Sequence, residues 1–155
     1  MIRQNGIHSV EKFVEIALYD KDFGYYIRNN PFGKNGDFIT SPTISNLFSE
    51  IIAIWLVSAW EKMGKPKIFN FVELGPGDGS LTKVIISTLK KFPELNKAIK
   101  IYLYEKSVFL KKLQKQNIDN KRIKWIKNFN SIKKGPVIFL VTNFLMQYQL
   151  NSFRI

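Results

Sequence analysis

Apolar and polar residues along this chain follow two different periods. Four short apolar runs predict buried strands, at 67–74, 99–105, 123–127 and 137–142. Two intervening segments, 79–92 and 107–117, carry apolar residues at the spacing of helices. Because strands alternate with helices, the pattern predicts an α/β fold with a parallel sheet and helices on both of its faces.

The first third of the chain is patterned differently. Residues 9–19 have apolar side chains at helical spacing, and Ser9 is a candidate N-cap. The next segment is rich in Gly, Asn, Pro and aromatic residues, and it predicts short strands at 24–28 and 37–40 around a turn.

A long helix is expected after this segment. Ser41 is a candidate cap and Pro42 suits the first helical position, where a missing N–H costs nothing. The helix should run to about Met63, because Gly64-Lys65-Pro66 is a stop signal. Its most apolar part, 51–60, is too short to cross a bilayer and is expected to be buried.

Composition excludes several classes of chemistry. There is no cysteine among the 155 residues, which rules out disulfides, thiolate zinc sites and cysteine nucleophiles. The single histidine, His8, is expected to be exposed or capping, so no metal site is predicted. No secretory signal is visible at the N-terminus, and we expect a cytoplasmic protein, or a mitochondrial one if the source is eukaryotic.

The formal net charge of +12 leaves a second class of function open. Such a charge can serve a nucleic acid or an acidic membrane surface. The lysines are scattered through expected helices and loops, however, and no nucleic-acid-binding motif accompanies them. Nucleic-acid binding is therefore kept as the less favoured alternative.

The stretch "FNFVELGPGDGSLTKVI" carries the most specific signal. Its glycine loop follows an expected strand and opens an expected helix, where parallel sheets bind ligands. It contains Gly75, Gly77 and Gly79, with Glu73 just before them and Asp78 between them. Glycines let the backbone approach a ligand closely and adopt angles that other residues resist.

The loop lacks the residues of the common phosphate-binding motifs. It has no Gly-Lys-Ser/Thr, and Ser80 replaces the last glycine of the dinucleotide fingerprint, which disfavours a nicotinamide cofactor. Its negative charge suits a cofactor that carries positive charge, and S-adenosylmethionine has an amino group and a sulfonium. Glu105, at the end of the next expected strand, is a candidate acceptor for ribose hydroxyls. The competing interpretation is a tight strand–helix turn with capping residues.

At "FVEIALYDKDFGYY", "NPFGKNGDFITSP", "LFSEIIAIW", "VELGPGDGSL" and "LYEKS" the chain resembles the MidA-like S-adenosylmethionine-dependent methyltransferases. These are relatives of the mitochondrial arginine methyltransferase that assists assembly of respiratory complex I. The resemblance implies a Rossmann-like class I methyltransferase fold with an N-terminal helical and loop extension. It also implies methylation of a protein arginine, on a complex I subunit. The chain would divide into the extension, 1–66, and a partial cofactor-binding domain, 67–155.

The resemblance also implies roles for individual residues. Glu73, Gly75, Gly77 and Glu105 would contact the cofactor. A second group would shape a lid or wall over it: Gly36, Asp37, Thr40 and Ser41. The local alternative for this second group is a Gly-Asp turn followed by a helix cap.

Two departures from the family pattern bear on catalysis. Thr43 replaces a glutamate in the first turn of the expected long helix. After Asn143, the sequence "FLMQYQL" lacks the acids with which the family follows its fourth strand. Carboxylates hold a guanidinium by paired hydrogen bonds, so their loss predicts impaired catalysis and leaves Asn143 as the remaining catalytic candidate.

The expected sheet has fewer strands than a complete domain of this kind. We therefore expect a truncated or split methyltransferase that stops after about the fourth strand, with a separately encoded C-terminal half as a candidate partner. The alternative is a non-catalytic remnant or interaction module.

Overall fold

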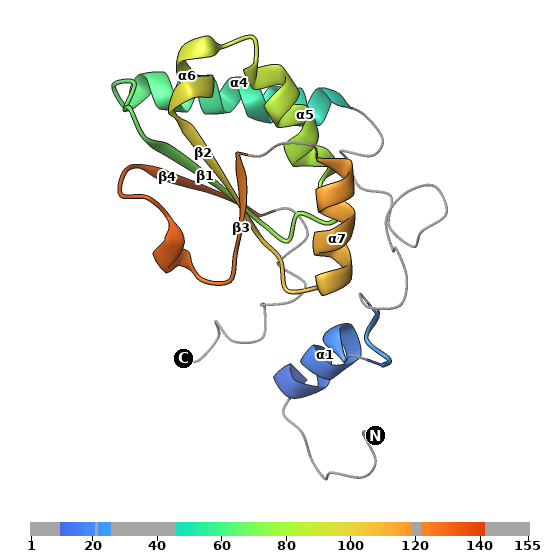
Figure 1. Ribbon diagram of the computed structural model, residues 1–155. Coiled ribbons are helices and arrows are strands. Elements are labelled where there is room, and N and C mark those ends of the chain that lie inside the picture. The colour runs from blue at the N-terminus through green and yellow to red at the C-terminus, as the bar shows by residue number, and fades with distance from the viewer. Residues whose placement is uncertain (1–9, 21, 26–45, 119–121, 142–155) are drawn as a thin grey trace.

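The computed structural model describes residues 10–20, 22–25, 46–118 and 122–141. Its centre is a parallel four-stranded sheet with the order β3-β2-β1-β4 (Figure 1). The strands are β1 (Phe69–Leu74), β2 (Ile99–Tyr104), β3 (Ile123–Ile126) and β4 (Val137–Val141). All four agree with the expected strands to within two residues at either end.

The helices are α1 (Val10–Tyr19), α4 (Asn46–Lys62), α5 (Ser80–Leu89), α6 (Pro93–Ala98) and α7 (Val108–Asn117), with a 3-10 turn η2 (Phe129–Ser131). Crossovers through α5 and α6, and through α7, lead outward from β1 to β2 and β3. The chain then returns through η2 to place β4 on the other side of β1 (Figure 1). This reversal of strand order next to β1 is the point at which open parallel sheets bind their ligands.

The main core lies on one face of the sheet. Phe69 and Phe71 of β1 point to this face and pack with Leu56 of α4 and Ile85 of α5. The other face carries a small cluster around Val72 and Tyr102, covered by Ile132 and Val137 rather than by a helix. The expectation of helices on both faces is therefore wrong for the residues that the structure describes. Helix α7 serves the first face as well, since Ile118 at its end joins the main core.

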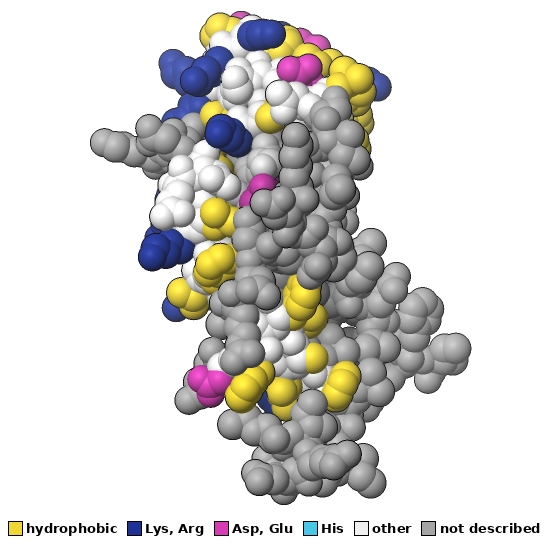
Figure 2. All heavy atoms as spheres, turned by 90° about the vertical axis from the view of Figure 1, so that its right-hand side faces the viewer, with side chains coloured by type: hydrophobic (Ala, Val, Ile, Leu, Met, Phe, Trp, Pro, Cys, Tyr) yellow, Lys and Arg dark blue, Asp and Glu magenta, His cyan; other side chains and the backbone are white. Residues whose placement is uncertain are grey.

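Helix α4 is apolar around most of its circumference. Ala53, Leu56 and Trp60 are buried against the sheet and α5, as the apolar run predicted. Its outer face nevertheless exposes large hydrophobic side chains, among them Leu47, Ile51, Ile54 and Trp55. In the view of Figure 2, hydrophobic side chains line the upper right margin, while Lys and Arg gather on the left.

The expected end of α4 is confirmed. Gly64 lies two residues after Lys62, the last residue of α4, and its φ of +80° is the usual conformation for a glycine that terminates a helix. Trp60 Nε1 donates a hydrogen bond to the carbonyl of Pro66 at 3.0 Å, which holds the connection to β1 against the helix. Because α4 shares the main core with the sheet, it positions β1, and the domain boundary expected at residue 66 stays a prediction.

Other expectations had mixed outcomes. The helix at 9–19 is confirmed as α1. The strand expected at 24–28 is wrong at its described end, where Tyr25 is helical. The strand expected at 37–40 lies outside the described residues, as does the start of the long helix. The helix expected at 79–92 ends earlier, at Leu89 of α5. The sequence interpretation missed α6, which follows it.

No helix among the described residues has the length and apolarity needed to span a membrane.

Candidate functional site

The glycine loop lies between β1 and α5, at the carboxyl end of the central strand. Gly75, Gly77 and Gly79 have φ angles of +66°, +58° and +83°, in the region that favours glycine. The loop therefore needs all three glycines for its backbone conformation, as the sequence predicted. Gly75 N–H donates to the carbonyl of Tyr104 at 3.0 Å, which joins the beginning of the loop to the end of β2.

Glu105 follows β2 and is buried beside this junction. Its Oε1 accepts a hydrogen bond from Ser107 N–H at 2.8 Å, and its Oε2 accepts one from Gln114 Nε2 at 3.3 Å. Burial raises the pKa of Glu105, while the hydrogen bonds from Ser107 and Gln114 act in the opposite direction. The carboxyl group is therefore oriented by neighbours from the start and the body of α7.

Glu73 is the second-last residue of β1 and lies in the sheet just before the glycine loop. It pairs with Leu103 of β2 and Leu140 of β4, and its side chain is fully buried. Burial raises the pKa of Glu73 to about 7; a hydrogen bond from Thr82 lowers it, and the charges of Asp78 and Glu105 raise it further. The second carboxyl oxygen, Oε1, has no hydrogen-bond partner among the described residues.

Asp78 has a local partner. Its Oδ1 accepts from Ser80 N–H at 2.9 Å and its Oδ2 accepts from Ser80 Oγ at 2.8 Å. These bonds cover part of the N-terminus of α5, where backbone N–H groups are otherwise unpaired. Asp78 thus stabilises the start of α5, and its negative charge remains beside the loop.

The structure brings together six of the residues singled out in the sequence: Glu73, Gly75, Gly77, Asp78, Gly79 and Glu105. The proposed lid residues Gly36, Asp37, Thr40 and Ser41 lie outside the described residues, and so does Asn143. No cluster of His, Asp or Glu in the described part of the chain could hold a metal ion.

Three residues of α7 and α5 in this site were missed: Gln114, Asn117 and Thr82. Gln114 Nε2 donates to the carbonyl of Gly77 at 2.7 Å, and Asn117 Nδ2 donates to that of Asp78 at 2.9 Å. A signal for Gln114 existed, because it falls one turn after Leu110 on the apolar face of an amphipathic helix. A polar residue at such a position needs a buried partner.

A family model fits most of this chain. The family described as "Putative S-adenosyl-L-methionine-dependent methyltransferase" matches residues 51–147, which include the glycine loop, Glu105 and α7. The chain belongs to this methyltransferase family. The resemblance that was drawn from the sequence motifs is thereby confirmed.

Relatives of this methyltransferase family member carry more specific names. The mitochondrial protein arginine methyltransferase NDUFAF7 homolog of Drosophila melanogaster is 43% identical over 115 residues, covering 74% of this chain and 26% of the relative. The NDUFAF7 of Danio rerio is 32% identical over 169 residues, covering 94% of this chain and 40% of the relative. The chain thus spans about a quarter to two-fifths of the length of the curated relatives it matches.

Solved structures confirm the fold of the family member. A Burkholderia thailandensis protein, crystallised with S-adenosyl-homocysteine, matches with a TM-score of 0.66 at 22% identity. The match covers 83% of this chain and 35% of that one. A second crystal structure from the same organism matches with a TM-score of 0.61 at 20% identity.

Proposed function

We propose that this chain forms the cofactor-binding part of an S-adenosyl-L-methionine-dependent methyltransferase. The observation that carries the proposal is the hydrogen bond from Gly75 N–H to the Tyr104 carbonyl. It brings a glycine loop with three left-handed residues next to Glu105, the buried acid at the end of β2. A loop that admits a ligand near its backbone and an acid that accepts hydrogen bonds suit a nucleoside with a ribose diol.

The charges of the site fit the same cofactor. Glu73, Asp78 and Glu105 lie close enough for the charges of the latter two to act on Glu73. Such negative charge suits the amino and sulfonium groups of S-adenosyl-L-methionine and opposes a pyrophosphate. Glu73 is fully buried and acts from beneath the loop, while Glu105 and the backbone of Gly75 and Gly77 receive the cofactor. When bound, the cofactor supplies an electrophilic methyl group.

The substrate class follows from the named relatives. Because these are protein arginine methyltransferases, we infer that the complete enzyme methylates an arginine of a protein. The sequence resemblance further favours a subunit of complex I, and the mitochondrial names of the relatives favour that compartment in a eukaryotic source, with the cytoplasm as its bacterial counterpart. Gly36, Asp37, Thr40 and Ser41 are proposed to line the cofactor or the substrate.

Catalysis by this segment alone is proposed to be weak. The residues after Asn143 lack acids that could hold a guanidinium. We therefore infer that a further polypeptide segment, corresponding to the remainder of the relatives, supplies acceptor-binding groups. A methylation assay of this chain, with and without the further segment, tests this inference. Full activity of this chain without the further segment contradicts it.

The test of the proposed function is calorimetric titration of S-adenosyl-L-methionine, after circular dichroism has shown that the chain is folded. Saturable binding with one site per chain supports the proposal. NADH serves as the matched control, since it shares the adenosine but carries a pyrophosphate, and it should bind more weakly. Preferred binding of NADH contradicts the proposal. Preferred binding of RNA, with an affinity that falls steeply with salt, favours the nucleic-acid alternative.

A further inference from the structure

The C-terminal end of α7 contacts three consecutive residues of the glycine loop, Gly77, Asp78 and Gly79. Gln114 donates to the carbonyl of Gly77, and Asn117 donates to that of Asp78. Gly79 is so close to Ile118 that a Cβ on this glycine would lie 2.7 Å from Ile118 Cδ1. The loop is therefore packed against a helix whose N-cap residue, Ser107, also donates a hydrogen bond to Glu105.

Gln114 makes the most consequential of these contacts. Its side chain is fully buried, and its Nε2 donates both to Gly77 O at 2.7 Å and to Glu105 Oε2 at 3.3 Å. Its Oε1 accepts from Trp125 Nε1 at 2.8 Å. Both ends of the amide are thus paired, which offsets the cost of burying it.

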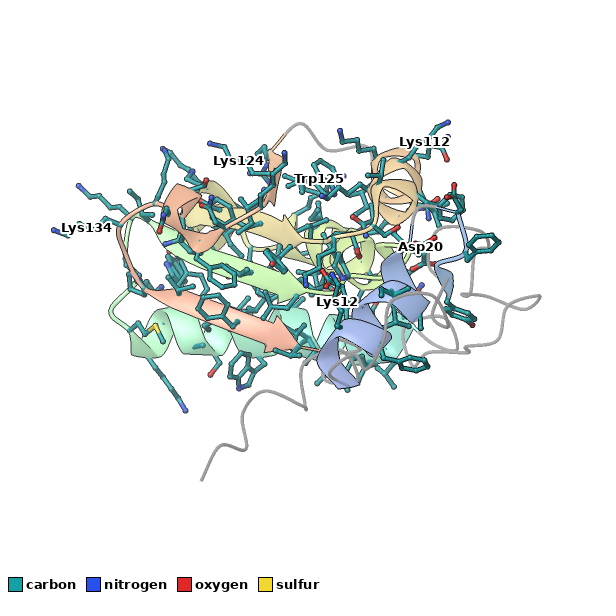
Figure 3. All side chains as sticks on the ribbon, turned by 90° about the horizontal axis from the view of Figure 1, so that it is seen from below. Lys12, Asp20, Lys112, Lys124, Trp125 and Lys134 are labelled. Atoms are coloured by element: carbon teal, nitrogen blue, oxygen red, sulfur yellow. The ribbon has the colours of Figure 1, made fainter. Side chains whose placement is uncertain are left out.

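Trp125 determines which way the amide points. An indole N–H can only donate, so it must face the amide oxygen of Gln114, and the two amide hydrogens must then face Gly77 and Glu105. Trp125 is a residue of β3 whose side chain faces α7, whereas Lys112 of α7 points away from the sheet (Figure 3). Lys115 Nζ lies over this ring, 5.5 Å from its centroid.

Two acceptors meet at the amide of Gln114. The carbonyl oxygen of Gly77 has a partial negative charge and the carboxylate of Glu105 a full one, and the two groups come from different crossovers of the sheet. Without a donor between them the two oxygens would repel each other, and each would lose the hydrogen bond that Gln114 donates to it in a buried place. A hydrophobic side chain at position 114 would fill the space but could not supply this donor.

We propose that Gln114 is a positioning residue of the cofactor site, which fixes Glu105 and the glycine loop relative to each other. This inference rests on the proposed function, since the ligand that benefits is the S-adenosyl-L-methionine assigned to that site. Gln114 does not touch the reacting atoms. It holds the Glu105 carboxylate and the backbone of Gly77 in one arrangement before the cofactor binds.

The first test needs no cofactor. The titration of Glu105 is followed by carboxyl carbon NMR in the wild type, in Gln114→Leu and in Gln116→Leu. Gln116 is an exposed residue of the same helix, so its substitution controls for the gain of a leucine. Gln114→Leu should raise the pKa of Glu105, because it removes a hydrogen bond that favours the charged form. Gln116→Leu should leave it unchanged.

Amide hydrogen exchange gives a second readout of the same variants. The amides of Gly75 and Gly79 donate to Tyr104 and Pro76 and report on the order of the loop. Their exchange should accelerate by about ten-fold in Gln114→Leu, the effect of one lost hydrogen bond. An unchanged titration of Glu105 together with unchanged exchange of both amides overturns the proposal, whether or not the cofactor binds.

The variant Gln114→Glu distinguishes positioning from space filling. It keeps the shape of the side chain but places a second carboxylate 3.3 Å from that of Glu105. Relative to wild type at each pH, its affinity for S-adenosyl-L-methionine should be about ten-fold lower at about pH 8 and should recover near pH 5, where the two carboxyls share a proton. Gln114→Leu should remain weak at both values.

The outcomes separate this proposal from the proposed function. Failure of the wild type to bind the cofactor contradicts the proposed function, and the cofactor-free measurements still decide the role of Gln114. Binding by the wild type with equal affinity in folded Gln114→Leu and Gln114→Glu overturns the positioning role alone. If Gln114→Leu does not fold, the pH profile of Gln114→Glu decides.

Discussion

Thr82 Oγ1 donates a hydrogen bond to Oε2 of Glu73, nine residues earlier in the chain, and both side chains are fully buried. The bond ties the first turn of α5 to the end of β1 beneath the glycine loop. Burial nevertheless dominates the environment of this carboxyl and raises its pKa from 4.5 to about 7. The free-energy cost of burying this carboxyl group therefore depends on pH.

We therefore predict that stability falls as the pH rises towards neutrality. The folded protein binds the Glu73 proton more tightly than the unfolded chain does, so the stabilisation is fully present below pH 4.5 and is lost as the pH rises through about 7. The change amounts to about 3 kcal/mol in the free energy of unfolding. Urea unfolding at pH 5 and pH 8 measures it. Glu73→Gln should remove most of the dependence, whereas Glu94→Gln, at an exposed position, should retain it.

Substitution of two left-handed glycines, one in the loop and one after α4, should separate the conformational cost of a side chain from its steric cost. Gly64 and Gly79 have φ of +80° and +83°, but a Cβ meets nothing within 4 Å at Gly64 and meets Ile118 at Gly79. Gly64→Ala should cost about 1 kcal/mol for its left-handed backbone. Gly79→Ala should cost about 1–3 kcal/mol more, because it crowds a packed core.

A double-mutant cycle checks this assignment. Ile118→Val removes the Cδ1 atom that a Cβ at position 79 would meet, so it should relieve part of the cost of Gly79→Ala. Additive costs in thermal unfolding of the single and double variants contradict the steric explanation. Gly79→Ala should also lower the affinity for S-adenosyl-L-methionine, whereas Gly64→Ala should leave that affinity unchanged.

The candidate site predicts distinct effects for its acid and for its backbone. Glu105→Ala should weaken S-adenosyl-L-methionine binding by about 1–3 kcal/mol, the usual size for hydrogen bonds to a charged group. Gly77→Val should abolish binding, because it places a β-branched residue at φ +58° where we propose that the backbone meets the ligand. Glu94→Ala, at an exposed position of α6, is the control for Glu105→Ala. Calorimetry that finds wild-type affinity in both site variants would mean that the loop is only a turn.

The sequence predicted those parts of the fold that depend on local pattern. The strand β1, the positive φ of its three following glycines and the end of α4 at Gly64 all follow from apolar runs and glycine placement. The short helix α6 was missed, although it begins at Pro93 and proline is favoured at a first helical position. The one-sided placement of the helices was missed because it depends on the return through η2, which has no periodic signal.

Long-range contacts limited what could be predicted of the site. Glu105 and the glycines were found because each follows a strand, and parallel strands end at one edge of the sheet. Gln114 lies 37 residues from Gly77, and their contact depends on how α7 packs. The full burial of Glu73 likewise depends on β4, which pairs with β1 although two other strands lie between them in the sequence.

The measurement that tests the central claim most directly is a nitrogen–proton NMR titration of the folded chain with S-adenosyl-L-methionine. If the cofactor binds at the site described, the amides of Gly75, Gly77 and Gly79 and those after Glu105 shift together with one dissociation constant. Their shifts should match those caused by S-adenosyl-homocysteine. A folded chain in which these amides stay unmoved, or in which only distant lysine-rich segments respond, contradicts the account.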